Sequence, residues 1–286
     1  MILQSVPISI VNTTKILFDK NLILTIGYVS KNWGDALNPI LIQKISGKKP
    51  LIVTKYTFNI RNRSVYSAIG SVLERANFLN SGHNNLIIWG TGLISDQGKI
   101  QVRPKEICAV RGPRTREILL KQGYNCPEIY GDPALLYPRF YKPKCNKKYK
   151  LGIIPHYIDK KNQFISNFQN DPDTLIIDIC GGINNVIDQI CNCQKVASSS
   201  LHGIIAADAY GIPAAWIKFS NNVTGSGFKF LDYFESVGRI DDMPFIIQKS
   251  SSIDDIFNIF YQYKLDIDLN LLWDVCPFSP VNIEQG

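Results

Sequence analysis

The chain has 286 residues, a hydrophobic content of 45%, and 31 basic against 24 acidic residues, for a formal net charge of +7. One hydrophobic core rarely organises such a length, so we expect two domains, residues 1–143 and 144–286. The positive charge favours acidic ligands or anionic surfaces, whereas no recognition-helix, zinc-finger or RNP pattern indicates a nucleic acid partner. The seven cysteines form no CxxC pair, so neither a disulfide framework nor a zinc site is predicted.

The composition of two segments bears on the location of the protein in the cell. Residues 1–20 lack the charged start and cleavage site of a signal peptide, and no later run approaches the roughly 18 apolar residues of a membrane span. We therefore expect a cytoplasmic protein. Segment 137–150 is rich in Pro and Lys, which predicts an interdomain linker. Contact of its lysines with the anionic inner face of a membrane stays open as an alternative.

Apolar runs alternate with helical patterns along the whole chain. Such alternation predicts an α/β fold with parallel sheets and crossover helices, arranged as two Rossmann-like domains. The expected strands lie at 22–26, 51–53, 66–70, 86–89, 107–110, 151–154, 174–179, 195–198 and 214–219. The expected helices lie at 36–45, 71–79, 113–122, 160–168, 183–191, 201–210, 228–236, 253–263 and 269–275.

The first ligand-facing loop precedes the expected helix 36–45, which Asp35 can cap and Gly47 can end. Asn32, Gly34 and Asp35 lie in this loop, at the carboxyl end of a strand, where α/β folds bind ligands. We therefore predict all three as cleft residues. A capping role alone is the alternative for Asp35.

Arginines crowd the start of the helix that begins at Pro113. Arg111 and Arg114 lie at the positive end of the helix dipole, where acidic residues are expected. This arrangement is tolerable when an anion lies among them, and a guanidinium matches phosphate and carboxylate geometry. We predict an anion site at these two arginines, with a solvated surface helix as the alternative. Asp132 follows a later strand end and can cap a short turn.

Segment 198–203 joins a strand to an Ala-rich helix. Its hydroxyls and the imidazole of His202 lie where free amides and the helix dipole attract anions, and Gly203 has no Cβ to keep a ligand from the backbone. His156 ends the strand 151–154 on the same rim, and Lys229 lies on an aromatic amphipathic helix. Capping serines, structural histidines and a solvated lysine are the alternatives.

Six sequence motifs, in the order in which they follow one another, resemble those of a known protein family. They are NWGDALNP at 32–39, VRGPRTREILLKQG at 110–123, YGDPALL at 130–136, IPHYID at 154–159, SSSLHGIIAADAYGIP at 198–213 and GFKFLDYFESVGR at 227–239. With them the chain resembles the polysaccharide pyruvyl transferase family, especially its short members that add pyruvate ketals to exopolysaccharide repeat units.

The resemblance implies two lobes facing a cleft, as in B-type glycosyltransferases, with phosphoenolpyruvate as donor and a sugar hydroxyl pair as acceptor. It places the general acid at His202. Relatives carry a donor-binding arginine two residues before that histidine, where this chain has Ser200. We therefore expect Arg111 and Arg114 to hold the donor, together with the turn residues Ser199, Ser200, Leu201 and Gly203.

The expected chemistry requires a proton at C3 of phosphoenolpyruvate and needs neither a metal nor a redox cofactor. A first-turn position lowers the proton affinity of His202, while a neighbouring phosphate raises it, so donor binding can supply the charged form. Asp35 or Asp132 is the candidate base toward the acceptor, a glycan or a lipid-linked oligosaccharide. A nucleotide-sugar glycosyltransferase and a catalytically silent glycan-binding protein, suggested by Ser200, stay open.

Overall fold

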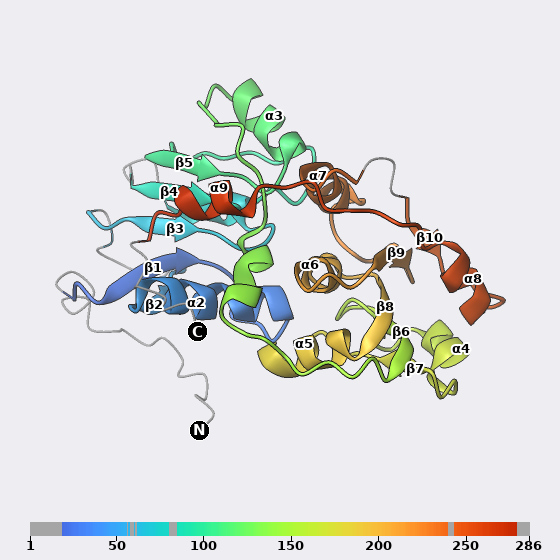
Figure 1. Cartoon of the computed structure of the whole chain (residues 1–286). Helices are drawn as coiled ribbons and strands as arrows, with labels where there is room; N and C mark the ends of the chain where they lie inside the picture. The colour runs from blue at the N-terminus through green and yellow to red at the C-terminus, as the bar shows by residue number, and fades with distance from the viewer. Residues whose placement is uncertain are drawn as a thin grey trace.

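The computed structural model describes residues 19–55, 57, 60, 62–79, 85–239 and 243–278. Within them the chain forms two five-stranded sheets in which all neighbours are parallel. Figure 1 shows one sheet in each of two lobes. The first lobe contains β1 (Leu22–Ile26), β2 (Lys49–Ile52), β3 (Val65–Ser67), β4 (Leu86–Trp89) and β5 (Glu106–Ala109), and the second contains β6 (Tyr149–Ile154), β7 (Thr174–Ile176), β8 (Cys193–Ser198), β9 (Ala214–Lys218) and β10 (Phe245–Ile246).

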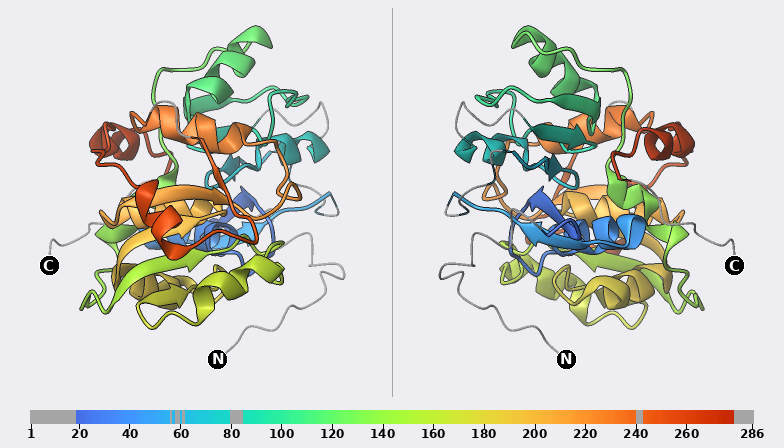
Figure 2. Two further views of the ribbon diagram at one scale, coloured as in Figure 1. Left: turned by 90° about the vertical axis from the view of Figure 1, so that its right-hand side faces the viewer. Right: turned by 90° about the vertical axis from the view of Figure 1, so that its left-hand side faces the viewer.

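Helices and loops connect the strands, because parallel neighbours need crossover connections. Figure 2 shows the molecule from its two ends, with the second lobe toward the viewer on the left and the first lobe on the right. The α-helices are α2 (Trp33–Ser46), α3 (Pro113–Lys121), α4 (Ser166–Gln169), α5 (Ile183–Cys191), α6 (Leu201–Ala209), α7 (Phe228–Ser236), α8 (Ile253–Asn258) and α9 (Leu269–Asp274). The 3₁₀ helices are η1 (Leu73–Phe78), η2 (Pro133–Arg139) and η3 (Gln163–Ile165).

Both sheets have the same strand order. The first is β2-β1-β3-β4-β5, and the second, taken from its β7 edge, is β7-β6-β8-β9-β10. In each sheet the strand order reverses at the first strand of the lobe, as in doubly wound α/β folds. Ligands of such sheets bind outside the carboxyl ends of the strands at the reversal. The topology therefore directs attention to the loops after β1 and β3 in one lobe and after β6 and β8 in the other.

The α/β class and several elements are confirmed. β1, β4 and α7 have the predicted bounds, and α2 ends as predicted at Gly47, whose φ of 67° is left-handed. All four side chains of β4 are buried, because helices and loops cover both faces of a parallel sheet. Continuous apolar runs were therefore a sufficient signal for these strands.

Other elements differ from the prediction. α2 begins at Trp33, so Asp35 lies inside its first turn and does not cap it. The expected helix 71–79 is the shorter 3₁₀ helix η1. The expected helix 160–168 is shortened because the side chain of Asn162 accepts a hydrogen bond from Phe164 N and starts η3 there. β10 was not predicted, because its two residues are too short for a periodic pattern.

The two lobes share an apolar core, in which α2 and η2 pack against α5 and α6. Trp33 donates from Nε1 to Ile183 O at 3.1 Å and from its backbone N to Ile179 O at 3.0 Å. Tyr137 donates its hydroxyl to Asn184 Oδ1 at 2.7 Å. An interface that is both apolar and hydrogen-bonded favours one fixed arrangement of the lobes.

A second connection between the lobes is made by α7, which follows β9 of the second sheet but packs on α3 of the first lobe. The carboxylate of Asp232 accepts hydrogen bonds from Arg111 Nε at 2.9 Å and from Thr115 N at 2.7 Å. The side chains of Arg111 and Asp232 are 0% exposed. Removing one partner of such a pair leaves a buried charge without compensation.

The described chain ends on the first lobe. Trp89 Nε1 donates to Leu272 O of α9 at 2.9 Å, and Figure 1 shows α9 alongside the strands of the first sheet. α9 thus lies with the first lobe although it comes last in the sequence. The division into residues 1–143 and 144–286 stays a prediction about folding units.

The predictions about membranes and leader segments are tested only in part. Among the residues that the structure describes, no helix has the length and apolarity to cross a membrane. In the linker, Lys147 donates to Cys193 O at 2.9 Å and Lys150 pairs with Asp173 at 2.6 Å. Contact of the linker with a membrane surface stays a prediction. The expectation about a signal peptide falls on residues 1–18, which lie outside the described part.

We expect Asp232→Asn to lower the free energy of unfolding by about 3–5 kcal/mol, because Arg111 would keep a buried charge without its counterion. Glu235→Gln is the matched control: it breaks the pair of Glu235 with Arg114, whose side chains are 34% and 38% exposed. That change should cost about 1 kcal/mol or less. Urea denaturation followed by tryptophan fluorescence measures both. If the two variants lost the same free energy of unfolding, the buried Arg111–Asp232 pair would contribute no more to stability than the exposed one.

Candidate active site

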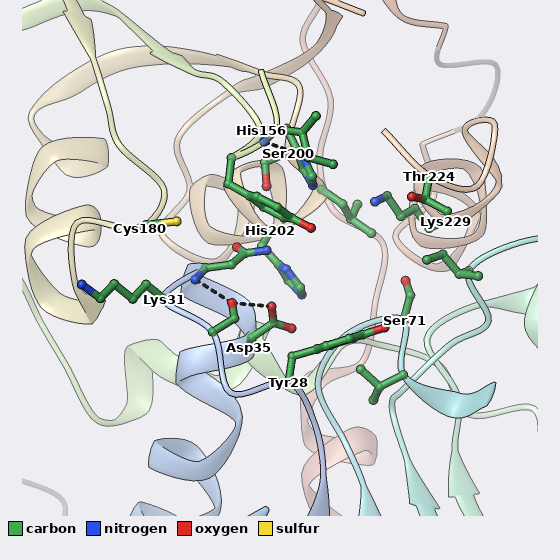
Figure 3. A pocket seen from close by; sticks show the side chains of 17 residues that line it. Tyr28, Lys31, Asp35, Ser71, His156, Cys180, Ser200, His202, Thr224 and Lys229 are labelled. Atoms are coloured by element: carbon green, nitrogen blue, oxygen red, sulfur yellow. Dashed lines mark hydrogen bonds between the residues drawn. The ribbon is translucent and has the colours of Figure 1, made fainter. Parts of the chain in front are cut away.

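A cleft of about 410 Å³ lies between the lobes. Its walls come from the loops after β1 and β3, the loops after β6 and β8, and α7 with the segment before it. Figure 3 shows labelled side chains of both lobes facing this space. The predicted site residues that line the cleft are Asn32, Asp35, His156, Ser200, Leu201, His202 and Lys229.

The first lobe contributes a polar loop between β1 and α2. Ser30 Oγ donates to Asp35 Oδ2 at 2.9 Å and accepts from Asn32 N at 2.9 Å. Burial raises the pKa of Asp35 above its ordinary value, although the hydrogen bond from Ser30 and the charge of Lys229 oppose this. Asn32 Oδ1 is buried in the cleft wall, and none of the described residues forms a hydrogen bond with it. The loop therefore presents two oxygen acceptors to a ligand.

The serine turn of the second lobe is mainly structural. Ser198 Oγ donates to Ile154 O at 3.0 Å, and Ser199 Oγ accepts from His156 N at 2.8 Å, so both hydroxyls hold the loop after β6. Of the three serines, Ser200 lines the cleft. The expectation for Gly203 is corrected: the space of its absent Cβ is filled by Ser198 Oγ, 2.4 Å away, and not by a ligand.

His202 is placed by close contact between the lobes. A Cβ on Gly34 would lie 2.3 Å from His202 Cγ, Cδ2 and Cε1, so the imidazole occupies the place of a side chain at position 34. Gly34 is thus a neighbour of the candidate acid and does not itself line the cleft. His202 Nε2 is buried and has no hydrogen-bond partner in the described part of the chain. A buried ring nitrogen without a partner is costly unless a ligand meets it.

The environment of His202 keeps its ring neutral. Burial lowers the pKa of His202 to about 3, and the charges of Lys229 and Arg111 act in the same direction. His156 is similar, since burial and Lys229 lower its pKa to about 4. His156 Nδ1 accepts from Ile158 N at 3.3 Å, which leaves the proton of the neutral ring on Nε2.

Lys229 is the cation that faces the cleft from α7. Burial, followed by the charge of Arg111, lowers the pKa of Lys229 to about 8. Among the described residues no carboxylate lies within ion-pair distance of its ammonium. Figure 3 shows Lys229 beside Thr224, on the far side of the cleft from Lys31. A partly desolvated ammonium without a counterion is suited to bind an anionic ligand.

The two arginines have protein partners. Arg111 is fully buried and pairs with Asp232, and its Nη1 donates to Ser71 Oγ, at a residue that lines the cleft. Arg114 pairs with Glu235 at 2.7 Å and lines a separate hollow. The anions that compensate this helix terminus are therefore carboxylates of α7. Arg111 lies behind the cleft wall, where its charge acts on His202, and it does not line the cleft.

Asp132 is also behind the site. Its side chain is 0% exposed, and its two carboxylate oxygens accept from Ala134 N at 3.0 Å and Gly70 N at 3.3 Å. Burial raises the pKa of Asp132 to about 6. The carboxylate holds the loop after β3 in place and does not line the cleft; among the described residues, Asp35 is the acidic residue that lines it.

Several cleft residues were not predicted. Tyr28, Lys31, Ser71, Tyr157 and Thr224 all line the cleft. Tyr28 and Ser71 follow β1 and β3 closely, so their positions after strands were a usable signal. Tyr157 stands beside the predicted His156, whereas no local pattern distinguishes Thr224. Among the described residues, no group of three or more His, Cys, Asp or Glu side chains is arranged to hold a metal ion.

Comparisons with known proteins agree with the motifs. The profile of the polysaccharide pyruvyl transferase family matches residues 61–221. An uncharacterized protein of Acanthamoeba polyphaga mimivirus is 32% identical over 251 residues, covering 84% of this chain and 83% of the relative. The succinoglycan biosynthesis protein ExoV of Rhizobium meliloti (strain 1021) is 30% identical over 179 residues, covering 59% and 52%. No solved structure matches significantly.

We expect Gly34→Ala to destabilise the protein by about 1–3 kcal/mol, because the new methyl group would overlap the ring of His202. In a His202→Ala background the same substitution has room, so its cost should fall by at least half. Urea denaturation of the four proteins of this cycle measures the coupling. Additive costs would show that the two residues are not in the described contact.

Acid destabilisation should also report on His202, whose pKa is 6.5 when unperturbed and about 3 in the fold. Between these values the unfolded chain binds more protons, so the contribution of His202 to stability falls as the pH falls. From pH 7 to pH 5 the loss amounts to about 2 kcal/mol. His202→Gln removes it, so wild type should lose that much relative to the variant. If the free energies of unfolding of wild type and His202→Gln fell equally between pH 7 and pH 5, the buried ring of His202 would not be neutral as described.

Proposed function

Because this chain belongs to the polysaccharide pyruvyl transferase family, we propose that it transfers a pyruvyl group from phosphoenolpyruvate to two hydroxyls of a glycan, forming a ketal. The observation that carries the proposal is the pair of His202 and Lys229 in one cleft. Among the described residues, the buried Nε2 of His202 has no hydrogen-bond partner and the ammonium of Lys229 has no carboxylate within ion-pair distance. This combination suits a ligand that brings negative charge and takes up a proton.

The donor is a small molecule with a phosphate and a carboxylate. Lys229 supplies the compensating charge, and the amino end of α6 supplies backbone amides and the positive end of the helix dipole. Ser200 lines the cleft at the place where relatives carry an arginine, and its hydroxyl is a neutral donor there. In this chain Lys229 of α7 thus compensates the negative charge of the donor, a role that the arginine has in relatives.

The proton transfer follows from the electrostatics of the cleft. Positive neighbours and burial keep His202 neutral, and a bound dianion beside Lys229 offsets both effects, so the ring takes up a proton with the donor. The imidazolium then delivers this proton to C3 of phosphoenolpyruvate, and positive character develops at C2. A sugar hydroxyl adds to C2, and the second hydroxyl then displaces phosphate, which takes up that hydroxyl's proton as it leaves, to close the ketal.

Asp35 is the base that we assign to the acceptor side. Its carboxylate lines the cleft, and its raised pKa moves it toward the range of a general base. It takes the proton of the first attacking hydroxyl, since Asp132 is enclosed by its backbone partners. The two lobes with a shared cleft further support a B-type glycosyltransferase-like architecture.

The acceptor is a polysaccharide or its precursor. The family name and the succinoglycan biosynthesis protein point to an exopolysaccharide repeat unit. We propose that the repeat unit is presented as a lipid-linked oligosaccharide at the membrane surface, where the linker lysines meet anionic headgroups.

The assay uses purified protein with phosphoenolpyruvate and β-galactosides or β-mannosides, and follows phosphate release and pyruvylated product. We expect His202→Gln to lower kcat by about 10²–10⁴-fold, because it removes the general acid. Lys229→Met should raise the KM for phosphoenolpyruvate at least about tenfold, a loss of about 1.4 kcal/mol of binding.

The control is Lys121→Met, which removes a lysine of α3 that pairs with Glu117 away from the cleft. It should leave both constants unchanged. Arg114→Ala tests the expectation that the arginines hold the donor. A higher KM for phosphoenolpyruvate in this variant would support a donor site at the arginines. Undiminished product in His202→Gln would exclude its role as acid. Product from a nucleotide sugar in place of phosphoenolpyruvate would favour a glycosyltransferase.

A further inference from the structure

Two tyrosines lie exposed in the wall of the cleft. Tyr28 follows β1 of the first lobe and is 40% exposed, and Tyr157 follows β6 of the second lobe and is 49% exposed. Their loops leave the two corresponding strands of the two sheets, each at its reversal of strand order. Large aromatic side chains are usually buried, and exposed ones that line a groove mark a binding surface.

Each tyrosine ring is supported on one side by a planar group. The guanidinium carbon of Arg75 lies 3.9 Å from the centroid of the Tyr28 ring. The rings of His156 and Tyr157 have centroids 4.3 Å apart, tilted by 36°. Because one face of each ring is covered while the side chain keeps a large exposed area, the remaining surface of each ring is available to a ligand. The support also reduces the entropy lost on binding.

Polar groups beside the tyrosines are hydrogen-bond acceptors. Asn32 Oδ1 is buried and has no hydrogen-bond partner among the residues that the structure describes, and Asp35 carries a carboxylate in the same wall. Figure 3 shows Tyr28 and Asp35 projecting from the same lobe, across from His156. Two acceptors next to aromatic rings suit a neutral polyol, which brings hydroxyl donors.

We infer that Tyr28 and Tyr157 form a clamp, one ring from each lobe, that holds a hexopyranose ring of the acceptor by its C–H faces. The clamp rests on the proposed function in that it names the acceptor subsite of the same cleft. A pyranose has apolar C–H faces and a rim of hydroxyls, so stacking between the tyrosines leaves the hydroxyls free to donate to Asn32 Oδ1 and Asp35. The phenol rings select for a sugar ring, and the hydroxyl groups of the tyrosines are not required.

The test measures binding separately from turnover. Saturation-transfer NMR with methyl β-D-galactopyranoside and methyl β-D-mannopyranoside reports affinity and the sugar protons that touch the protein. We expect at least one of the two probes to bind, with saturation concentrated on ring C–H protons. Tyr28→Ala and Tyr157→Ala should each weaken that binding about tenfold, and Tyr28→Phe and Tyr157→Phe by less than about threefold, because stacking is retained.

The matched control is Tyr261→Ala, at a tyrosine that is 48% exposed and lines a different hollow. It should leave sugar binding unchanged. In steady-state assays the two cleft alanine variants should raise the KM for the acceptor and not for phosphoenolpyruvate. Thermal unfolding of each variant checks that the exposed substitutions leave the fold intact.

The outcomes separate the clamp from the reaction. Sugar affinity that is the same in wild type and both alanine variants, or absent in wild type for both probes, overturns the clamp. Binding of uridine diphosphate that the alanine variants lose, with sugar binding unchanged, also overturns it in favour of a nucleotide site. Tyrosine-dependent sugar binding without any pyruvylated product supports the clamp and overturns the proposed reaction alone.

Discussion

The contact of His202 with Gly34 is the constraint on which the site depends. The imidazole belongs to α6 of the second lobe, and the backbone that it lies against belongs to α2 of the first. This contact is possible because the shared core around Trp33 and Tyr137 brings the same helices together. The cleft is therefore part of the packing of the molecule, and its histidine is positioned by contact with the other lobe. Positioned groups of this kind need little reorganisation during a reaction.

The charges around the cleft are balanced in two layers. Behind the wall, Arg111 and Asp232 compensate each other completely and connect α3 with α7. In the wall, no carboxylate of the described residues lies within ion-pair distance of Lys229, and burial together with the charges of Lys229 and Arg111 keeps His202 neutral. Helix α7 thus supplies both the Asp232 carboxylate that neutralises Arg111 and the Lys229 ammonium that faces the cleft. An incoming anion would complete the balance, and in the proposed reaction this would couple donor binding to the protonation state of the histidine.

Local sequence patterns were sufficient to predict much of the fold and the position of His202 in the cleft. Continuous apolar runs located β1 and β4, and the strand-to-helix junction at Ser200 placed His202 in the cleft. The partner of Arg111 was out of reach, because Asp232 lies 121 residues further along the chain. The same limitation applies to Asp132, which accepts from Gly70 N 62 residues earlier, and to Tyr28, whose ring lies against Arg75. Residue type and helix position indicated an anion beside the arginines but could not tell a carboxylate of the protein from a ligand.

The most direct test of this account is the protonation state of His202 with and without donor. The chain has only three histidines, so ¹⁵N-labelled imidazoles can be resolved and assigned with the His202→Gln variant. At pH 7 we expect His202 to show the neutral pattern in the free protein and the imidazolium pattern when phosphoenolpyruvate saturates the cleft. A ring that stays neutral in the saturated complex, or one that is already charged in the free protein, would contradict the account.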